Sequence, residues 1–276
     1  MTIQAMSIDD LEIVLGWAAD EGWNPGLDDA PAFLAADPAG FLIKKVDDEP
    51  VAAISVVNHS PKFAFLGLYI CKPEHRGHGY GIGIWQAGIA HAGPRTIGLD
   101  GVPDQQSNYA RSGFVRNGST IRYGGRIEAA SDKRMRPATP TELRALVSRD
   151  VKVTGIDRLA FSTAWLSQTP NRNTLVLIDG TNINGFATFR RCRQGVKIGP
   201  LQATCEADAL SLIASNPFAG SNDPIFVDIQ SEGSPFCKLL EKQGFEPTFE
   251  TARMYKGPPP KADPARYQAI ATMELG

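Results

Sequence analysis

The chain has 276 residues, of which 42% are hydrophobic and 21% charged. This balance is typical of a globular protein with a sizeable core, and the length suits two domains of ordinary size. The formal net charge of −2 does not favour nucleic-acid binding. No apolar run approaches the roughly 20 residues that cross a bilayer, and the first residues do not resemble a signal peptide, so we expect a cytoplasmic protein without a membrane partner.

The four cysteines are scattered and form no CxxC pair, so we expect neither a metal site nor a disulfide framework. The charge is unevenly distributed. Residues 1–50 contain eleven acidic residues against Lys44 and Lys45, which makes this segment strongly acidic and the rest of the chain basic.

The first half alternates helical and strand-like patterns. Ser7 precedes Asp9, Asp10 and apolar residues at helical spacing, which predicts a helix over 8–21. The remaining expected elements are a helix over 28–36, an antiparallel meander of strands over 41–46, 51–58 and 63–71, a helix over 82–92, a strand over 96–101, a helix over 104–112 and a strand pair over 116–127.

Residues 128–140 are polar and contain proline, which indicates a linker. The second half is expected to contain a helix over 141–148, strands over 174–178 and 183–191, a helix over 206–214, a strand over 224–229, a helix over 234–243 and a strand over 250–255. The tail beyond Pro260 is expected to be loose or a short helix. Ser112-Gly113-Phe114 and Gln243-Gly244-Phe245 end comparable helices, which favours two diverged copies of one fold.

Alternating glycines lie between a predicted strand and a predicted helix, in the sequence Arg76-Gly77-His78-Gly79-Tyr80-Gly81. Backbone amides at a helix N-terminus point outward and carry the positive end of the helix dipole, so they bind phosphate without any side chain. Glycine lets that backbone approach the anion closely. The segment is therefore predicted to bind a phosphate group.

Two common phosphate loops do not fit this segment. A dinucleotide fingerprint needs GxGxxG, but Ile82 follows Gly77 and Gly79 where glycine is required, although Asp100 lies where a ribose-binding acid would stand. A P-loop needs a Gly-Lys-Ser/Thr ending, which the segment lacks.

The arginine-x-x-glycine-x-glycine pattern at 76–81 resembles the acyl-CoA pyrophosphate loop of the GNAT superfamily of N-acyltransferases. The later Tyr109-Ala110-Arg111-Ser112-Gly113-Phe114 resembles the family's tyrosine-x-x-x-glycine-phenylalanine helix end. The resemblance covers about residues 1–127. It implies an N-acetyltransferase that takes acetyl-CoA as donor substrate and lets a primary amine attack it directly in a ternary complex.

The resemblance also implies the fold, an α/β (α+β) architecture of two GNAT-like domains, each a mixed, mostly antiparallel twisted sheet flanked by helices. We expect a catalytic acetyl-CoA-binding domain over 1–130, a linker over 131–140 and a degenerate GNAT-like domain over 141–276. In the second half, Gly199-Pro200-Leu201 replaces the glycine loop and Leu240 stands where Tyr109 would, so no acyl-CoA chemistry is expected there.

Carried over to this sequence, the resemblance implies that the backbone of Ile70 and Cys71 pairs with the pantetheine arm. It implies that the pyrophosphate is held by the loop residues Arg76, Gly77, His78, Gly79, Tyr80, Gly81 and Ile82. Val102 stands where the family often has an asparagine, so Gln105 or Gln106 is the expected replacement for its CoA contact.

The resemblance implies that Tyr109 is the general acid that protonates the CoA thiolate, since a phenol and a thiol differ little in pKa. The general base stays open, because the predicted strand over 63–71 carries no carboxylate. Glu21, His59 and Asp100 are the candidates. We favour Asp100, which ends the strand expected beside the acyl group.

Acidic residues and an indole cluster between the first two helices, at Asp20, Glu21, Trp23, Asn24, Asp28 and Asp29. Such a pocket suits a cationic amine, so Glu21, Trp23 and Asn24 are the expected acceptor contacts. A solvated acidic helix face with Trp23 in the core is the alternative. The acceptor is expected to be a small-molecule or peptide amine, and the chain a monomer or homodimer. A non-catalytic acyl-CoA sensor or scaffold is the alternative function, and it would have no use for Tyr109.

Overall fold

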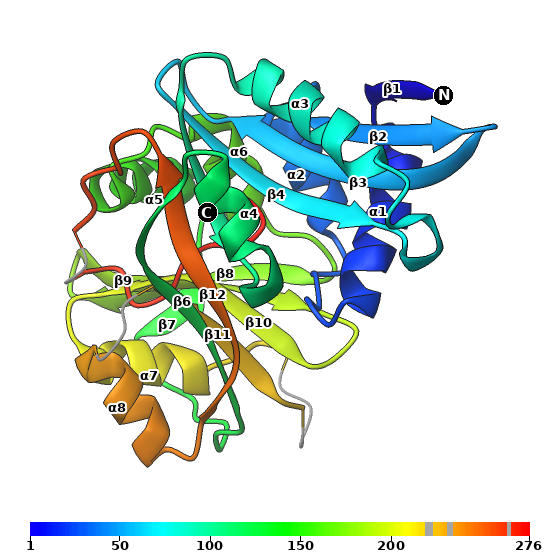
Figure 1. The fold of residues 1–276 in the computed structure, drawn as a ribbon. Coiled ribbons are helices and arrows are strands. Elements are labelled where there is room, and N and C mark those ends of the chain that lie inside the picture. The colour runs from blue at the N-terminus through cyan, green and yellow to red at the C-terminus, as the bar shows by residue number, and fades with distance from the viewer. Residues whose placement is uncertain (219–222, 231–233, 264–265) are drawn as a thin grey trace.

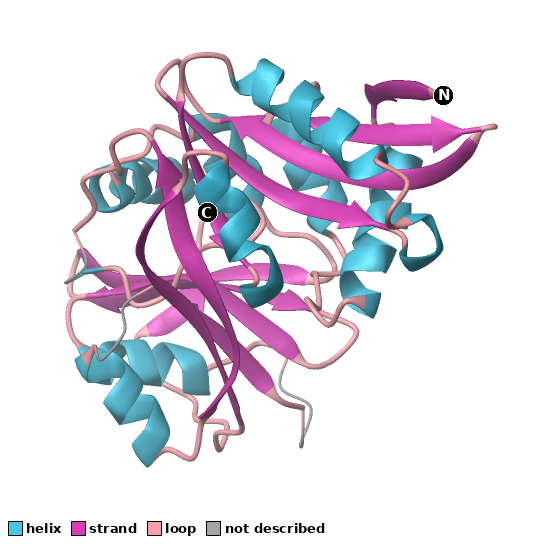
Figure 2. Cartoon of the chain, in the orientation of Figure 1, coloured by secondary structure: helices cyan, strands magenta, loops and turns pink. Residues whose placement is uncertain are grey.

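The computed structural model describes residues 1–218, 223–230, 234–263 and 266–276. Within these residues, twelve strands form one sheet in the order β1-β2-β3-β4-β5-β12-β6-β11-β10-β9-β8-β7. Helices flank the sheet in both halves (Figures 1 and 2). The pairs β4–β5 and β10–β11 are parallel and the other pairs are antiparallel, which confirms the expected mixed, mostly antiparallel fold.

The elements of the first half follow the expected order, after a first strand that the patterns do not reveal. These are β1 (Thr2–Ala5), α1 (Ile8–Asp20), α2 (Asp29–Ala36), β2 (Phe41–Val46), β3 (Glu49–Asn58), β4 (Phe63–Cys71), α3 (Tyr80–Ala92), β5 (Thr96–Gly101), α4 (Gln106–Arg111) and β6 (Val115–Gly125), with short 3-10 turns at Pro73–His75 and Pro103–Gln105. Helix α1 begins where the pattern predicts, because Ser7 and Asp10 form a capping box.

The second half contains three elements that the predicted set lacks. Its elements are β7 (Met135–Pro137), α5 (Pro140–Thr154), α6 (Leu159–Leu166), β8 (Arg172–Asp179), β9 (Asn182–Arg191), β10 (Val196–Ala203), α7 (Glu206–Ala214), β11 (Ile225–Ile229), α8 (Pro235–Lys242) and β12 (Glu246–Lys256). The three are β7, α6 and β10, and β10 includes Gly199-Pro200-Leu201, where a loop was expected. Helix α6 lacks a clear polar face, and β7 lies in the expected linker. Among the described helices, none is both long and apolar enough to cross a membrane.

The two halves exchange strands. Strand β12 lies between β5 and β6, so the last strand of the chain completes the sheet of the first half, while β6 pairs with β11 of the second half. The expected strand pair over 116–127 is wrong for this reason. Gly118 pairs with Arg253 of β12, and β6 continues as one strand instead of turning back at Asn117.

Residues 268–276 are buried, so the expected loose tail or short helix is wrong for this segment, which we call the tail. It lies between the two halves, where Figure 1 marks the C-terminus near the centre of the molecule. The Ile270 amide donates to the Asp228 carbonyl (2.9 Å), and the Arg158 guanidinium donates to the Gly276 carbonyl. The tail is therefore part of the core.

Candidate active site

Strand β4 leaves its neighbours at a bulge. Its parallel pairing with β5 ends at Leu66 and Leu99, although both strands continue, and its register with β3 shifts between Gly67 and Ile70. Leu68 has a φ of 45°, a conformation that costs about 1 kcal/mol or more in a residue other than glycine. Backbone polar groups of β4 are thereby released from the sheet, and strained positions of this kind cluster at functional sites.

The glycine loop has the conformation that phosphate binding needs. Gly77 and Gly79 have φ values of 81° and 75°, which favour glycine, and a Cβ at either position would meet only open space. Gly79 is the N-cap of α3 and offers no side-chain cap, so the first amides of this helix stay available. The loop therefore fits a pyrophosphate group.

Cations lie beside this loop. The Arg76 guanidinium donates to the Glu21 carboxylate (2.6 Å) and to the Cys71 carbonyl (3.0 Å). Lys44 on β2, which the sequence reasoning passed over, places its Nζ 5.1 Å from the centre of the Tyr80 ring. His78 is exposed, with Nδ1 3.0 Å from the Arg76 carbonyl.

The other residues expected to bind the acyl donor lie at the end of β4 and at the start of α3. Ile70 is buried and Cys71 half-buried, and burial raises the pKa of the Cys71 thiol. Ile82 is exposed on the first turn of α3. A Cβ on Gly81 would lie 2.8 Å from the Tyr69 hydroxyl, so glycine lets this helix pack on β4.

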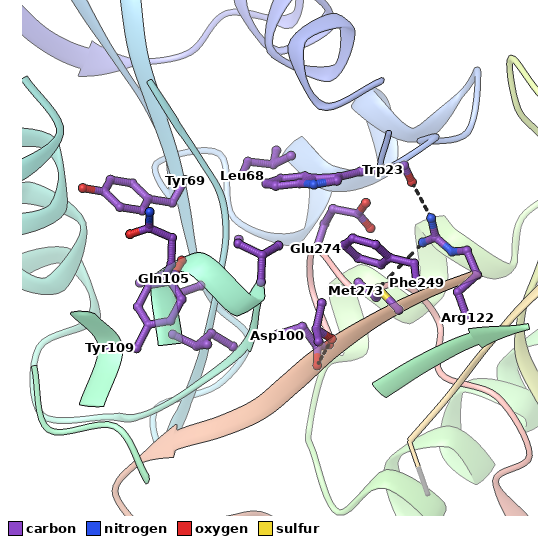
Figure 3. Close-up of a pocket in the computed structure, with 15 residues that line it drawn as sticks. Trp23, Leu68, Tyr69, Asp100, Gln105, Tyr109, Arg122, Phe249, Met273 and Glu274 are labelled. Carbon is purple, nitrogen blue, oxygen red and sulfur yellow. Dashed lines mark hydrogen bonds between the residues drawn. The ribbon is translucent and has the colours of Figure 1, made fainter. Parts of the chain in front are cut away.

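A cavity of about 570 Å³, including its open mouth, lies at the bulge (Figure 3). Its walls come from both halves of the chain. They are formed by Trp23, Leu66, Gly67, Leu68, Tyr69, Leu99, Asp100, Val102, Gln105, Tyr109, Arg122, Phe249, Thr251, Met273 and Glu274.

Tyr109 reaches this cavity from α4, where its ring lies beside Trp85 with ring centres 5.7 Å apart. Burial raises the pKa of the Tyr109 hydroxyl, and nearby Tyr69 raises it further. No described residue is hydrogen-bonded to this hydroxyl. Tyr109 therefore carries a proton that it can donate to a group in the cavity.

Asp100 also lines the cavity, but both of its carboxylate oxygens are engaged. Oδ1 accepts from Thr120 (2.7 Å), Thr251 (3.2 Å) and Arg253 Nε (3.0 Å), and Oδ2 accepts from Arg253 Nη2 (2.6 Å). This geometry suits a residue that holds the sheet together, so the base proposed below is a different carboxylate.

The other two candidate bases are not among the residues that line the cavity. Glu21 is paired with Arg76 at the glycine loop. His59 has Nε2 2.8 Å from the Leu275 carbonyl, and its ring stacks on Phe63. Burial lowers the pKa of His59 to about 4, and the Arg158 cation contributes to the shift. His59 is thus a neutral contact of the tail.

Of the three expected acceptor contacts, Trp23 lines the cavity and Glu21 and Asn24 do not. The Trp23 carbonyl accepts hydrogen bonds from Arg122 (3.0 Å) and Lys197 (3.2 Å). The Asn24 amide donates to the Gln194 carbonyl (2.8 Å), so it joins the two halves of the chain.

The neighbouring acids are structural. Buried Asp29 forms ion pairs with Arg172 (2.8 Å) and Arg190 (2.5 Å), and Asp28 accepts hydrogen bonds from Thr169 and Asn171. Part of the acidic surplus of the first segment is therefore matched by cations of the second half rather than reserved for a substrate.

Sequence reasoning missed the part of the cavity that comes from distant segments. Gly67 lies on the expected strand, but nothing in its sequence context signals the bulge. The others belong to β6, β12 and the tail, namely Arg122, Phe249, Met273 and Glu274. Gln105, one of the two glutamines considered for a CoA contact, does line the cavity, whereas Gln106 donates to the Gly101 carbonyl (3.2 Å).

The corresponding region of the second half is filled by the chain itself. After the residues of β10 that pair with β11, Leu201 forms an isolated antiparallel β-bridge with Ala269 of the tail. A Cβ on Gly199 would collide with the Ile270 carbonyl oxygen, so the tail packs directly on the backbone of β10. Helix α7 begins with Glu206 and Asp208, whose charges oppose anion binding at that helix N-terminus. The described residues thus fill that place, and the absence of acyl-CoA chemistry in the second half stays a prediction.

Comparisons with known proteins agree with this geometry. The acetyltransferase (GNAT) family model matches residues 8–114, and an acetyltransferase (GNAT) domain model matches residues 146–267. The holothin acyltransferase of Pseudoalteromonas sp. (strain SANK 73390) is 34% identical over 100% of this chain and 94% of its own length.

Solved structures share the fold. A putative acetyltransferase from Pyrococcus horikoshii superposes with a TM-score of 0.79 at 20% identity, over 100% of this chain and 95% of its own. A tandem GNAT protein from the clavulanic acid biosynthesis pathway gives a TM-score of 0.61 at 14% identity, over 93% and 99% of the two chains. The chain therefore belongs to the GNAT superfamily and is a tandem GNAT acyltransferase.

Proposed function

We propose that this acyltransferase transfers an acetyl group from acetyl-CoA to a primary amine by direct attack in a ternary complex. The observation that carries the proposal is that one cavity contains Tyr109, the bulge of β4 and a set of side chains from β6, β12 and the tail. A donor held by the loop and an acceptor held by these side chains meet at the bulge.

The donor side is assigned to the first half. The amides from Gly77 to Ile82 hold the pyrophosphate, with Arg76 and Lys44 beside them, and the freed backbone of β4 up to Cys71 pairs with the pantetheine arm. The uncapped start of α3 and the open space at Gly79 support this assignment. We propose that residues 1–130 provide this site and that 141–276, beyond the 131–140 linker, provide β12 and the tail.

In the reaction, the amine nitrogen attacks the thioester carbonyl and a C–N bond forms. Released amides of β4 near Leu68 stabilise the oxyanion. The C–S bond then breaks, and Tyr109 gives its proton to the thiolate. The amine loses one proton to a base, and proton exchange with solvent restores Tyr109.

The acceptor is proposed to be a compact primary amine with an apolar body. Trp23, Leu68, Phe249 and Met273 supply most of the wall around the acceptor space (Figure 3). The acidic residues expected to attract a cationic amine are engaged elsewhere, Glu21 with Arg76 and Asp29 in buried ion pairs. The holothin acyltransferase relative makes holothin the first acceptor to test.

Calorimetric titration with acetyl-CoA tests the donor site. Gly79→Trp places a bulky side chain in the phosphate space and should abolish the single binding event of the wild type. Gly180→Trp is the matched control, because Gly180 has a comparable φ of 58° and open space but lies in the β8–β9 turn. Two sites, or one that survives Gly79→Trp, would refute the assignment to the first half.

Release of CoA with different amines tests the reaction. Holothin and small apolar primary amines should be turned over faster than polyamines, aminoglycosides and lysine peptides. Acetyl-CoA should be a better donor than hexanoyl-CoA. Binding of acetyl-CoA without turnover of any amine would contradict the proposed acceptor class.

A further inference from the structure

We propose that Glu274, delivered by the tail, is the general base that takes the proton from the attacking amine. The inference rests on the proposed function and names a catalytic component that the second half supplies. Strand β4 carries no carboxylate, and Asp100 on β5 has both oxygens engaged. Among the described residues, Glu274 is the other carboxylate that lines the cavity.

The tail places Glu274 at the bulge of β4. Its backbone packs so closely on Gly67 that a Cβ at residue 67 would collide with the Glu274 carbonyl oxygen. Gly67 immediately precedes Leu68, the strained residue of the bulge. Since the thioester carbonyl is assigned to this bulge, Glu274 lies beside the carbon that the amine attacks.

The Glu274 side chain points into the cavity, between Trp23 and Phe249 (Figure 3). The residue is only 4% exposed. Its Oε2 accepts a hydrogen bond from the Thr272 hydroxyl. Among the described residues, no other hydrogen bond reaches this carboxylate, so Oε1 is available to a ligand.

The neighbouring cations do not neutralise Glu274 by direct contact. Arg122 and Lys197 interact with it electrostatically. Arg122 is held by the Asp228 carboxylate (2.7 and 3.0 Å), and both cations donate to the Trp23 carbonyl. The carboxylate therefore stays free to accept a proton from an amine in the same cavity.

Glu274 and Tyr109 then have complementary roles. Figure 3 shows Tyr109 beside Gln105 at one end of the cavity, and Glu274 near Trp23 and Phe249 at the other. As the C–N bond forms and the C–S bond breaks, one proton passes from nitrogen to Glu274 and another from Tyr109 to sulfur. Glu274 returns its proton to solvent and Tyr109 regains one, so the net products are an amide and free CoA.

Glu274→Gln is the direct test, because the amide keeps the shape and can still accept the Thr272 hydrogen bond. With a strongly basic amine, kcat should fall about 100-fold or more, while the Kd for acetyl-CoA stays within twofold of wild type. Glu250→Gln is the matched control, because Glu250 is an exposed residue of β12 outside the cavity, and its kcat should not change. Circular dichroism and Tm establish that each variant is folded.

The loss of kcat in Glu274→Gln is also measured with a series of primary amines of decreasing pKa. If Glu274 were only structural, this loss would not depend on the pKa of the amine. The Glu274→Gln defect should shrink about tenfold for a weakly basic amine that arrives without an extra proton. Thr272 is a positioning residue, so Thr272→Val should lower kcat more than it raises KM, and Thr272→Ser should restore activity. This second variant keeps the inference testable if Glu274→Gln fails to fold.

Wild-type turnover is measured first. Its absence with every amine would contradict the proposed function and this inference together. If the wild type is active and Glu274→Gln keeps kcat within threefold with a strongly basic amine, the inference alone is overturned.

Discussion

Arg253 and Asp100 form a buried two-point ion pair that joins β12 to β5. Arg253 Nη2 lies 2.6 Å from Asp100 Oδ2 and Arg253 Nε 3.0 Å from Oδ1, and the two side chains are 3% and 1% exposed. Because β12 follows the whole second half in sequence, this pair fixes the exchanged strand in the first half. Asp100 also lines the cavity, so one member of the pair that joins the halves belongs to the site.

Asp100→Asn should destabilise the protein by about 3 kcal/mol, because it leaves the buried Arg253 charge without its partner. Urea unfolding checks this value. Glu250→Gln breaks an exposed ion pair between β12 and Arg116 of β6, 3.6 Å long, and should cost less than about 1 kcal/mol. Equal losses for the two variants would show that the buried pair is not a major link between the halves.

Tyr109→Phe should lower kcat about 100-fold and leave the Kd for acetyl-CoA unchanged, because the phenol acts on the departing thiolate and not on the pyrophosphate. Stopped-flow turnover and calorimetry separate the two effects. Tyr123→Phe is the matched control, since Tyr123 bonds Glu241 (3.0 Å) away from the cavity.

The raised pKa of Tyr109 has a consequence at alkaline pH. The group stays protonated in the folded enzyme above its ordinary titration range, so activity should not fall through its ionisation below about pH 10. A Tyr109-dependent loss of kcat near pH 8 would contradict the assigned role.

His59 should make the protein less stable in mild acid. Its pKa is about 4 in the folded protein, mainly because of burial, against about 6.5 in the unfolded chain. Between these values the unfolded chain binds more protons, so stability is full above about pH 6.5 and falls as the pH decreases toward 4. The titration of His59 should lower the free energy of unfolding by about 2 kcal/mol between pH 7.5 and 5.

Urea unfolding at several pH values measures this loss. His59→Gln removes the titrating group, so the decrease in the free energy of unfolding between pH 7.5 and 5 should be smaller by about that amount, whatever the stability of the variant at pH 7.5. His78→Gln changes an exposed histidine and should leave the slope as in the wild type. An unchanged slope in His59→Gln would mean that the buried ring is not responsible.

Local patterns predicted much of the first half because local interactions decide it. The capping box of Ser7 and Asp10 starts α1 where the sequence places it, and alternating glycines before α3 give the open loop that a phosphate needs. The parts that failed depend on distant partners. Asn117 and Gly118 form a common turn pair, yet they stay extended because β12 arrives from the end of the chain to pair with them.

The candidate site divides in the same way. The glycine loop and Tyr109 belong to local motifs that resemble those of the family, so both could be predicted as site residues from the sequence. Asp100 was a reasonable base on sequence grounds, but its engagement with Arg253, 153 positions away, is visible only in the fold. The contacts of Glu21 and Asn24 also lie outside the cavity. Glu21 accepts a hydrogen bond from Arg76, and Asn24 donates one to the Gln194 carbonyl.

The sequence by itself determined the family, the open glycine loop before α3 and most of the helices and strands of the first half, because these follow from residues close together in the chain. The tertiary structure alone decided the strand exchange, the burial of the tail and the acceptor side of the cavity. Those features depend on which surfaces and opposite charges meet after folding. Asp29 meets Arg190, and Glu274 meets Gly67, across long stretches of sequence that no local periodicity connects.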